Sequence, residues 1–188
     1  MKPFGEYTDE ELYSAFSDKK KFAEAAFAEF YQRYSGKLYG YCMKLLGSHN
    51  ELKDLYQDIF LKFFNSSKER AEMDNPRAYL FRIAHNICIN YIRDKKETVN
   101  YDDIIWKGEN ESLSYEDKEL IELINEALKQ VEHHNREAFI LRMYQGMTYK
   151  EIAEIQGISV TLSRNRVWRT KERVKKILDP YLKELSFE

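Results

Sequence analysis

Apolar residues recur at helical spacing along most of the chain, and no stretch shows the clean two-residue alternation of a half-buried strand. This pattern predicts helices over about residues 9–16, 20–46, 50–64, 76–96, 118–131 and 135–144, and a pair of helices within residues 147–178. Gly47-Ser48 and Asn75-Pro76 mark two of the boundaries. Asp179-Pro180 is expected to interrupt the last helix. The predicted fold class is all-α.

The predicted helix 50–64 has one wide apolar face and one polar face. The apolar face carries Leu52, Leu55, Tyr56, Ile59, Phe60 and Phe63. The opposite side carries Asp54, Gln57 and Asp58, with Leu61 among them. A single leucine on a polar face is often incidental, but it is also typical of an anchor for a partner helix.

The predicted helix 76–96 also has two faces. Its buried stripe is expected to consist of Leu80, Ile83, Ala84, Ile87 and Tyr91. The other side gathers Tyr79, Arg82, Asn86, Asn90 and Arg93. Aromatic, amide and guanidinium groups on one face can stack on unpaired bases and hydrogen-bond to them. A plain solvated face is the alternative, and periodicity does not distinguish the two. His85 lies one residue off this face and is given no role.

Residues 147–176 carry the turn chemistry of two helices around a tight turn. Thr148 and Glu151 have the spacing of a capping box, which opens the first helix. Gly157 stands at the turn, where the backbone needs a residue free to take positive φ. Ser159 can cap the second helix. The segment is therefore predicted to form a helix-turn-helix.

The second helix of this pair is basic on one side. Its core face should consist of Val167, Thr170, Val174, Ile177 and Leu178. Another sector holds Leu162, Arg166, Arg169 and Arg173, and further charge comes from Arg164, Lys171 and Lys175. A cationic helix supported across a turn is the geometry that enters a major groove, and arginine suits phosphates and guanine edges. An ordinary solvated basic face is the alternative, but the turn chemistry favours nucleic-acid binding.

Charge and composition limit the classes of protein to which this chain could belong. The 188-residue chain has a net charge of −2, yet basic residues crowd the C-terminal helix while residues 97–117 are acidic and lack periodicity, as in a linker. Cys42 and Cys88 fall within apolar helical patterns and are expected to be reduced core residues. No catalytic constellation, metal site or cofactor loop is visible, so neither an enzyme nor a cofactor is expected. The start has no apolar signal region, which predicts a cytoplasmic protein without membrane insertion.

The sequence resembles the extracytoplasmic-function group of sigma factors, the small two-domain members of the sigma-70 family. The resemblance covers roughly residues 20–96 and 118–178. Residues 27–41 (FAEFYQRYSGKLYGY) are similar to the opening helix of the family, and residues 54–64 (DLYQDIFLKFF) to its polymerase-binding helix. Residues 78–93 (AYLFRIAHNICINYIR) are similar to its promoter-melting helix, and residues 149–169 to its minus-35 helix-turn-helix. The order and spacing of the four segments together are specific.

This resemblance implies a sigma domain 2 over residues 1–96, a flexible acidic linker over 97–117 and a sigma domain 4 over 118–188. It implies that the β′ clamp helices of bacterial core RNA polymerase are bound by Asp54, Gln57, Asp58 and Leu61. The minus-10 element, with one base extruded into a pocket, would lie against Tyr79, Arg82, Asn86, Asn90 and Arg93. The minus-35 element would meet Thr161, Leu162, Arg164, Asn165, Arg166, Arg169 and Arg173. The β flap, promoter DNA and an anti-sigma protein complete the implied partners.

One three-residue segment departs from the family in a way that predicts a contact. Members often have Gly-Thr-Val where this chain has Thr161-Leu162-Ser163. Ser163 should then lie on the core side and Leu162 on the DNA side, where we expect it to contact a thymine methyl group or a sugar edge.

Other functions remain possible from the residues alone. A helix-turn-helix transcriptional regulator that works without polymerase is the main alternative, and a helical adaptor with an incidental basic face is the second. Steep salt dependence of DNA binding would separate a DNA-binding protein from the adaptor.

Overall fold

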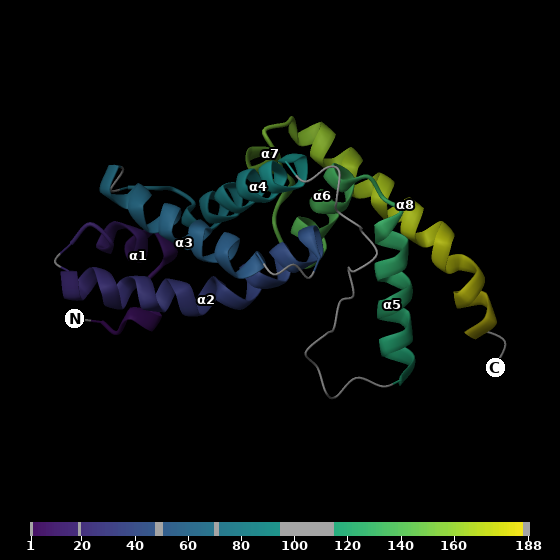
Figure 1. Ribbon diagram of the computed structural model, residues 1–188, viewed down its shortest axis with the longest axis horizontal. Helices are drawn as coiled ribbons and strands as arrows, with labels where there is room; N and C mark the ends of the chain where they lie inside the picture. The colour runs from purple at the N-terminus through teal and green to yellow at the C-terminus, as the bar shows by residue number, and fades with distance from the viewer. Residues whose placement is uncertain (1, 19, 48–50, 70–71, 95–114, 186–188) are drawn as a thin grey trace.

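The computed structural model describes residues 2–18, 20–47, 51–69, 72–94 and 115–185, and within these ranges it contains helices and no strand. The all-α prediction is confirmed. The N-terminal helices form one end of an elongated molecule, and α5 and α8 form the other (Figure 1).

The N-terminal half is a bundle with an aromatic core. It comprises η1 (Phe4–Glu6), α1 (Asp9–Ala15), α2 (Lys20–Leu46), α3 (Leu52–Glu69) and α4 (Pro76–Asp94). The ring centroids of Phe30 and Phe63 are 4.8 Å apart in a stacked pair, and Phe16 meets both rings edge-on. Such ring pairs contribute beyond the area they bury, so this cluster fixes α2 against α3.

The C-terminal half contains the predicted helix-turn-helix. Its elements are α5 (Tyr115–Lys129), α6 (His133–Met143), α7 (Tyr149–Gln156) and α8 (Val160–Leu185). The capping box of Thr148 and Glu151 is formed, and Gly157 ends α7 with a φ of 65°. Ser159 Oγ accepts a hydrogen bond of 3.1 Å from the Leu162 amide, as predicted for the cap of α8.

Two predicted helix ends are wrong. α3 continues to Glu69, through residues expected to form a loop or a short helix, because the hydroxyls of Ser66 and Ser67 bond back to helical carbonyls and leave the helix intact. α8 continues through Pro180 to Leu185 instead of being interrupted. A proline removes one backbone donor, but burial of Val174 and Leu178 holds the preceding turns in place.

The buried face of α4 differs from the predicted stripe. Leu80 and Ala84 are buried as expected, whereas Ile83, Ile87 and Tyr91 are only half-buried. The remaining core positions are occupied by Ala78, Phe81, Cys88 and Ile92. α4 packs against α2 and α3 and also against α7, so its buried face is rotated toward the C-terminal half. Cys42 and Cys88 are both buried and free, as predicted.

The two halves pack directly against each other. One hydrophobic cluster joins core residues of α2, α3 and α4 to Ala138, Ile140, Leu141, Met147, Ile152, Ile155 and Val167 of the C-terminal half. A second, smaller cluster lies between α5, α6 and α8. α7 consequently lies beside α4 (Figure 1).

Most of the predicted linker, 97–117, lies outside the described residues. Its last residues belong to α5, which begins at Tyr115. Across the described ranges, every helix is too short or too polar to cross a membrane.

Candidate nucleic-acid interface

The DNA-contacting side predicted for α8 is open to solvent. Thr161, Leu162, Arg164, Asn165, Arg169 and Arg173 are all exposed. The core side carries Val167, Thr170, Val174 and Leu178, which are buried, and Ile177, which is half-buried. The helix therefore presents a continuous polar and basic surface, as its periodicity predicted.

The pair Leu162 and Ser163 adopts the predicted orientation. Leu162 is 38% exposed, while Ser163 is fully buried and its hydroxyl donates 2.9 Å to the carbonyl of Tyr149. This hydrogen bond ties the start of α8 to the start of α7. Leu162 is thus an apolar side chain at the exposed tip of a basic helix.

Arg166 differs from the other residues predicted to contact DNA. It is half-buried, and its Nη1 donates 3.0 Å to Gln156 Oε1 at the end of α7. An arginine engaged in this way must first break that contact to reach a base edge. In this arrangement of the chain it is a bracing residue of the helix-turn-helix.

Sequence reasoning missed Trp168. The side chain of this tryptophan is 61% exposed, and it lies one turn beyond Arg164 on α8. A large apolar ring left in solvent on a basic face is unusual, and a flat ring can lie against a sugar or a base. In the helical projection, Trp168 lies outside both the core sector and the arginine sector. An apolar ring at such a position could have been identified as exposed from the sequence.

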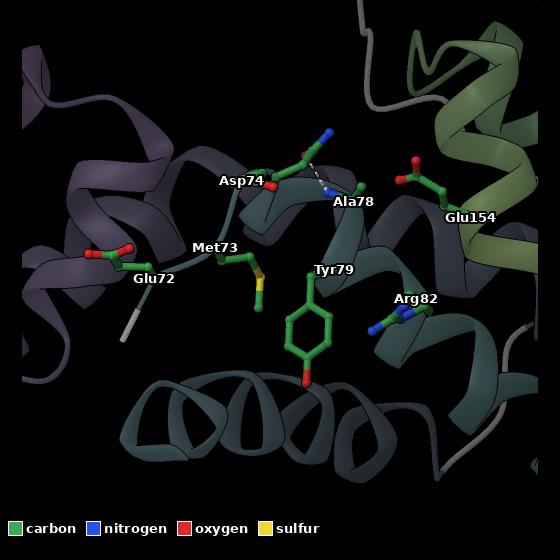
Figure 2. A pocket seen from close by; sticks show the side chains of 8 residues that line it. Glu72, Met73, Asp74, Ala78, Tyr79, Arg82 and Glu154 are labelled. Atoms are coloured by element: carbon green, nitrogen blue, oxygen red, sulfur yellow. Dashed lines mark hydrogen bonds between the residues drawn. The ribbon is translucent and has the colours of Figure 1, made fainter. Parts of the chain in front are cut away.

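The predicted face of α4 borders a cavity. Arg82, Asn86, Asn90 and Arg93 are exposed, and Tyr79 is half-buried with its ring centroid 6.2 Å from that of Phe63. The Arg82 guanidinium lies 5.1 Å from the centroid of the Tyr79 ring, in a cation–π arrangement. Figure 2 shows both side chains projecting from the same helix into this space.

The cavity has a volume of about 460 Å³. It is lined by Glu72, Met73, Asp74, Asn75, Ala78, Tyr79, Arg82 and Glu154. Glu154 comes from α7 in the other half of the molecule and faces the space from the opposite side (Figure 2). A cavity of this size with one aromatic ring, one guanidinium and an amide can accommodate a planar, hydrogen-bonding ligand such as a nucleobase.

The predicted partner face of α3 is also exposed. Asp54, Gln57, Asp58 and Leu61 all lie at the surface, and Leu61 is 59% exposed. A protruding leucine within a ring of polar groups is the arrangement expected of an anchor at a protein interface.

A buried carboxylate joins the two halves. Glu137 of α6 is fully buried and accepts hydrogen bonds from Tyr41 of α2, from His85 Nδ1 of α4 at 2.7 Å, and from Gln156 Nε2 at 2.7 Å. Burial opposes ionisation of this carboxyl, but the hydrogen bonds from His85, Tyr41 and Gln156 outweigh it and lower the pKa of Glu137. His85, given no role from the sequence, is therefore part of the contact between the halves.

Within the described ranges, no group of three or more histidine, cysteine or acidic side chains could hold a metal ion. The rings of His133 and His134 lie next to each other, with centroids 3.7 Å apart and planes tilted by 42°. The exposed faces of α4 and α8 carry arginines, amides and aromatic rings.

Family models match both halves of the chain. Residues 30–98 match the model of Sigma-70 region 2, and residues 121–174 match that of Sigma-70, region 4. The two matches together cover more than half of the sequence. They enclose α3, α4, α7 and nearly all of the basic side of α8.

Individual relatives agree with these matches. The chain is 26% identical to the ECF RNA polymerase sigma-E factor of Haemophilus influenzae, over 84% of this chain and 89% of that protein. It is also 26% identical to the ECF RNA polymerase sigma factor SigW of Bacillus subtilis, over 85% and 92% of the two chains. Similar folds occur in Bartonella quintana RpoE, solved with the anti-sigma factor NepR (TM-score 0.65, 24% identity, 81% and 96% coverage), and in CnrH, solved with the cytosolic domain of CnrY (TM-score 0.64, 21% identity, 92% and 97% coverage).

Proposed function

The chain belongs to the extracytoplasmic-function group of the sigma-70 family and is a promoter-recognising subunit of RNA polymerase, and on this premise we propose how its exposed faces divide that work. Residues 1–96 bind core polymerase and the minus-10 element, residues 97–117 link the two units, and residues 118–188 bind the minus-35 element. Sigma factors are regulatory subunits without catalysis of their own, and this chain acts in the cytoplasm by binding energy alone.

The exposed face of α3 is the docking face for core polymerase. Leu61 supplies the apolar anchor, and Gln57 with Asp54 and Asp58 supplies polar contacts around it. Interfaces gain most of their free energy from a few such anchors surrounded by groups that exclude water. The expected partner surface is the pair of clamp helices of the β′ subunit, and the C-terminal unit rests on the β flap.

The face of α4 holds the displaced strand of the minus-10 element. An extruded base stacks on Tyr79 within the cavity, while Arg82, Asn86, Asn90 and Arg93 contact the strand along the exposed side. Extruding a base costs a few kcal/mol, and stacking one base on an aromatic side chain returns about 1–3 kcal/mol. Several contacts along α4 are therefore required to offset strand opening.

The basic face of α8 lies in the major groove of the minus-35 element. Arg164, Arg169 and Arg173 reach phosphates and guanine edges, with Thr161 and Asn165 between them. Leu162 meets a thymine methyl group. Arg166 contacts the duplex once its hydrogen bond to Gln156 is broken.

Two exposed interaction faces on one chain, α3 with its protruding leucine and α8 with its arginines, carry this proposal. A regulator that binds duplex DNA without polymerase would need only the basic face of α8. The similar Bartonella quintana RpoE was solved with an anti-sigma factor, and a protein of that kind is the expected inhibitor of this chain as well.

The test is run-off transcription with bacterial core polymerase on a promoter library, with and without the chain. Initiation that depends on the chain and selects particular promoters is expected. Alanine at Gln57 and Leu61 should abolish initiation while duplex binding by the free chain stays unchanged. Specific duplex binding without any stimulation of polymerase would contradict the sigma function and support a polymerase-independent regulator.

A further inference from the structure

We propose that a small cavity between α2, α5 and α6 is a binding site for one monatomic anion of the size of chloride. This inference goes beyond the proposed function, because none of the residues that line the cavity is assigned to polymerase or to DNA. It assigns a ligand to a group of buried cationic side chains for which the promoter contacts have no use.

The cavity lies where three helices meet. Its volume is about 10 Å³, which is close to the space that one water-sized particle needs. The site therefore takes a single small occupant and has no room for a nucleotide or a peptide side chain. Its lining consists of Lys44 of α2, Asn125, Leu128 and Lys129 of α5, and Arg136 and Ile140 of α6.

The charged groups of this lining are all cationic. Lys44 comes from the N-terminal half, and Lys129 and Arg136 come from the C-terminal half. Arg136 is only 3% exposed, and the side chain of Lys129 is 14% exposed. Lys129 also donates 2.7 Å to Glu126, but that carboxylate is largely exposed and does not line the cavity. Like charges gathered away from water disfavour one another, so a negative charge placed between them is stabilised.

Burial acts directly on the charge of Lys44. It lowers the pKa of this side chain to about 8, because a buried ammonium group loses part of its hydration. Its Nζ lies 4.7 Å from the centroid of the Tyr144 ring, whose face attracts a cation and holds the group in place. An anion in the cavity replaces the interaction that water gives to an exposed lysine.

Asn125 supplies the observation that points to a ligand. The residue is 8% exposed, and its Nδ2 is buried without a hydrogen-bond partner among the described residues. A buried donor in this state costs free energy, and an ion or a water molecule is the usual partner of such a group. Because Asn125 lines the same cavity as the three cationic side chains, one acceptor placed there can bind all of them.

The chemistry of the lining selects an anion over water. A water molecule has two hydrogens of its own to place on acceptors, whereas ammonium and guanidinium groups only donate. A chloride ion accepts from several donors, donates none and has the opposite charge to the three cations. Leu128 and Ile140 supply apolar walls, and the attraction between opposite charges is stronger in such surroundings than in water.

The first test follows thermal unfolding of the full-length chain while sodium chloride replaces sodium gluconate at constant ionic strength. A ligand that binds only the folded chain raises the melting temperature with its concentration. Wild type should gain roughly 3 °C when chloride reaches ten times its dissociation constant.

Asn125→Asp is the matched variant for this measurement. Its carboxylate puts a permanent negative charge beside Lys44 and Arg136, so the melting temperature at low chloride should rise and the gain from chloride should disappear. Gln130→Glu is the control, because Gln130 is exposed just after the end of α5 and the substitution adds the same charge outside the cavity. This control should respond to chloride as wild type does, and general effects of the salt exchange are common to all three chains.

An equal response of wild type and Asn125→Asp to chloride would overturn the proposal, and so would the absence of any response in wild type. In the second case a water molecule, or the side-chain oxygen of Asn125 turned into the cavity, accepts from the donors.

The second test needs no variant. Crystals of the full-length wild-type chain grown in sodium bromide should show a peak of anomalous scattering within hydrogen-bond distance of Asn125 Nδ2, because bromide has the charge of chloride and nearly its size. A water molecule in this place, or bromide bound only elsewhere on the surface, would overturn the proposal.

Discussion

The two faces proposed to bind nucleic acid differ in their accessibility. On α8 the arginine side points to solvent, with six of the seven side chains predicted to contact DNA exposed. On α4 the middle and end of the face are exposed. At its start, Asn75 is bonded to Glu151 of α7 and Arg77 to the carbonyl of Gln145, and Glu154 lines one side of the cavity. The contrast shows that the two faces have different surroundings, because only the α4 face lies next to the contact between the halves.

The largest effect is expected from a substitution on the basic face of α8. Arg169→Ala should weaken binding of the free chain to its minus-35 duplex by roughly 10- to 100-fold, or about 1–3 kcal/mol, because one guanidinium–base contact contributes on that scale. Arg82→Ala, which alters the α4 face, should leave duplex binding by the free chain unchanged. Fluorescence anisotropy with a duplex selected from the promoter library measures both, and equal losses in the two variants would contradict the division between the faces.

Acid should weaken the contact between the halves. The pKa of Glu137 is lowered from its ordinary value of 4.5, as is that of Glu151, which accepts from Asn75. A carboxyl with a lower pKa in the folded chain contributes stability that is complete above its unfolded pKa and disappears as pH falls through its folded pKa. The free energy of unfolding should therefore decrease as pH falls below about 4.5.

Urea unfolding between pH 7 and pH 3 measures this effect. Glu137→Gln should flatten the dependence, because the variant has no proton to bind at that site. A steeper dependence in Glu137→Gln than in wild type would show that this carboxyl is not the group responsible.

Asn75 has two roles, as the cap of α4 and as a hydrogen-bond donor to α7, and two substitutions can distinguish them. Asn75 Oδ1 accepts 2.8 Å from the Ala78 amide, while Nδ2 serves Glu151. Asn75→Ala should cost about 1 kcal/mol from the cap alone, whereas Asn75→Asp keeps the cap and places a second carboxylate beside Glu151. Asn75→Asp should thus lose less stability than Asn75→Ala, which thermal unfolding tests. Loss of stability in Asn75→Asp equal to that in Asn75→Ala would contradict this separation.

Leu162→Ala gives the smallest expected change. Loss of one methyl contact should reduce binding roughly fourfold, or about 0.8 kcal/mol, at a single thymine position of the minus-35 element. Duplexes substituted one base pair at a time, compared between wild type and Leu162→Ala, measure the effect. An unchanged preference at every position would exclude the contact, whereas a uniform loss would indicate backbone contact only.

Local chemistry determined much of the fold from the sequence. The capping box of Thr148 and Glu151, the positive φ of Gly157 and the cap at Ser159 depend on neighbours within a few residues, and all three were predicted. The same holds for the orientation of Leu162 and Ser163, which follows from helical period alone. Each of these features is decided over a distance shorter than two helical turns.

Tertiary packing decided what the sequence left open. Periodicity predicted only part of the buried stripe of α4, because α4 is apolar over much of its circumference and its packing against α2, α3 and α7 together selects which residues are covered. Pro180 does not end α8, and the burial of Val174 and Leu178 against other helices holds the turns before it in place. Sequence patterns contain no information on those partners.

The sequence by itself therefore determined the helices, the helix-turn-helix and the two proposed recognition faces, because each depends on the spacing of residues within a single segment. Only the tertiary structure brought Tyr41, His85 and Glu137 together across 96 residues of chain, and it alone placed α7 against the start of α4. A hydrogen bond between distant segments depends on how whole helices pack, and helix packing is set by the summed burial of both halves rather than by any one spacing.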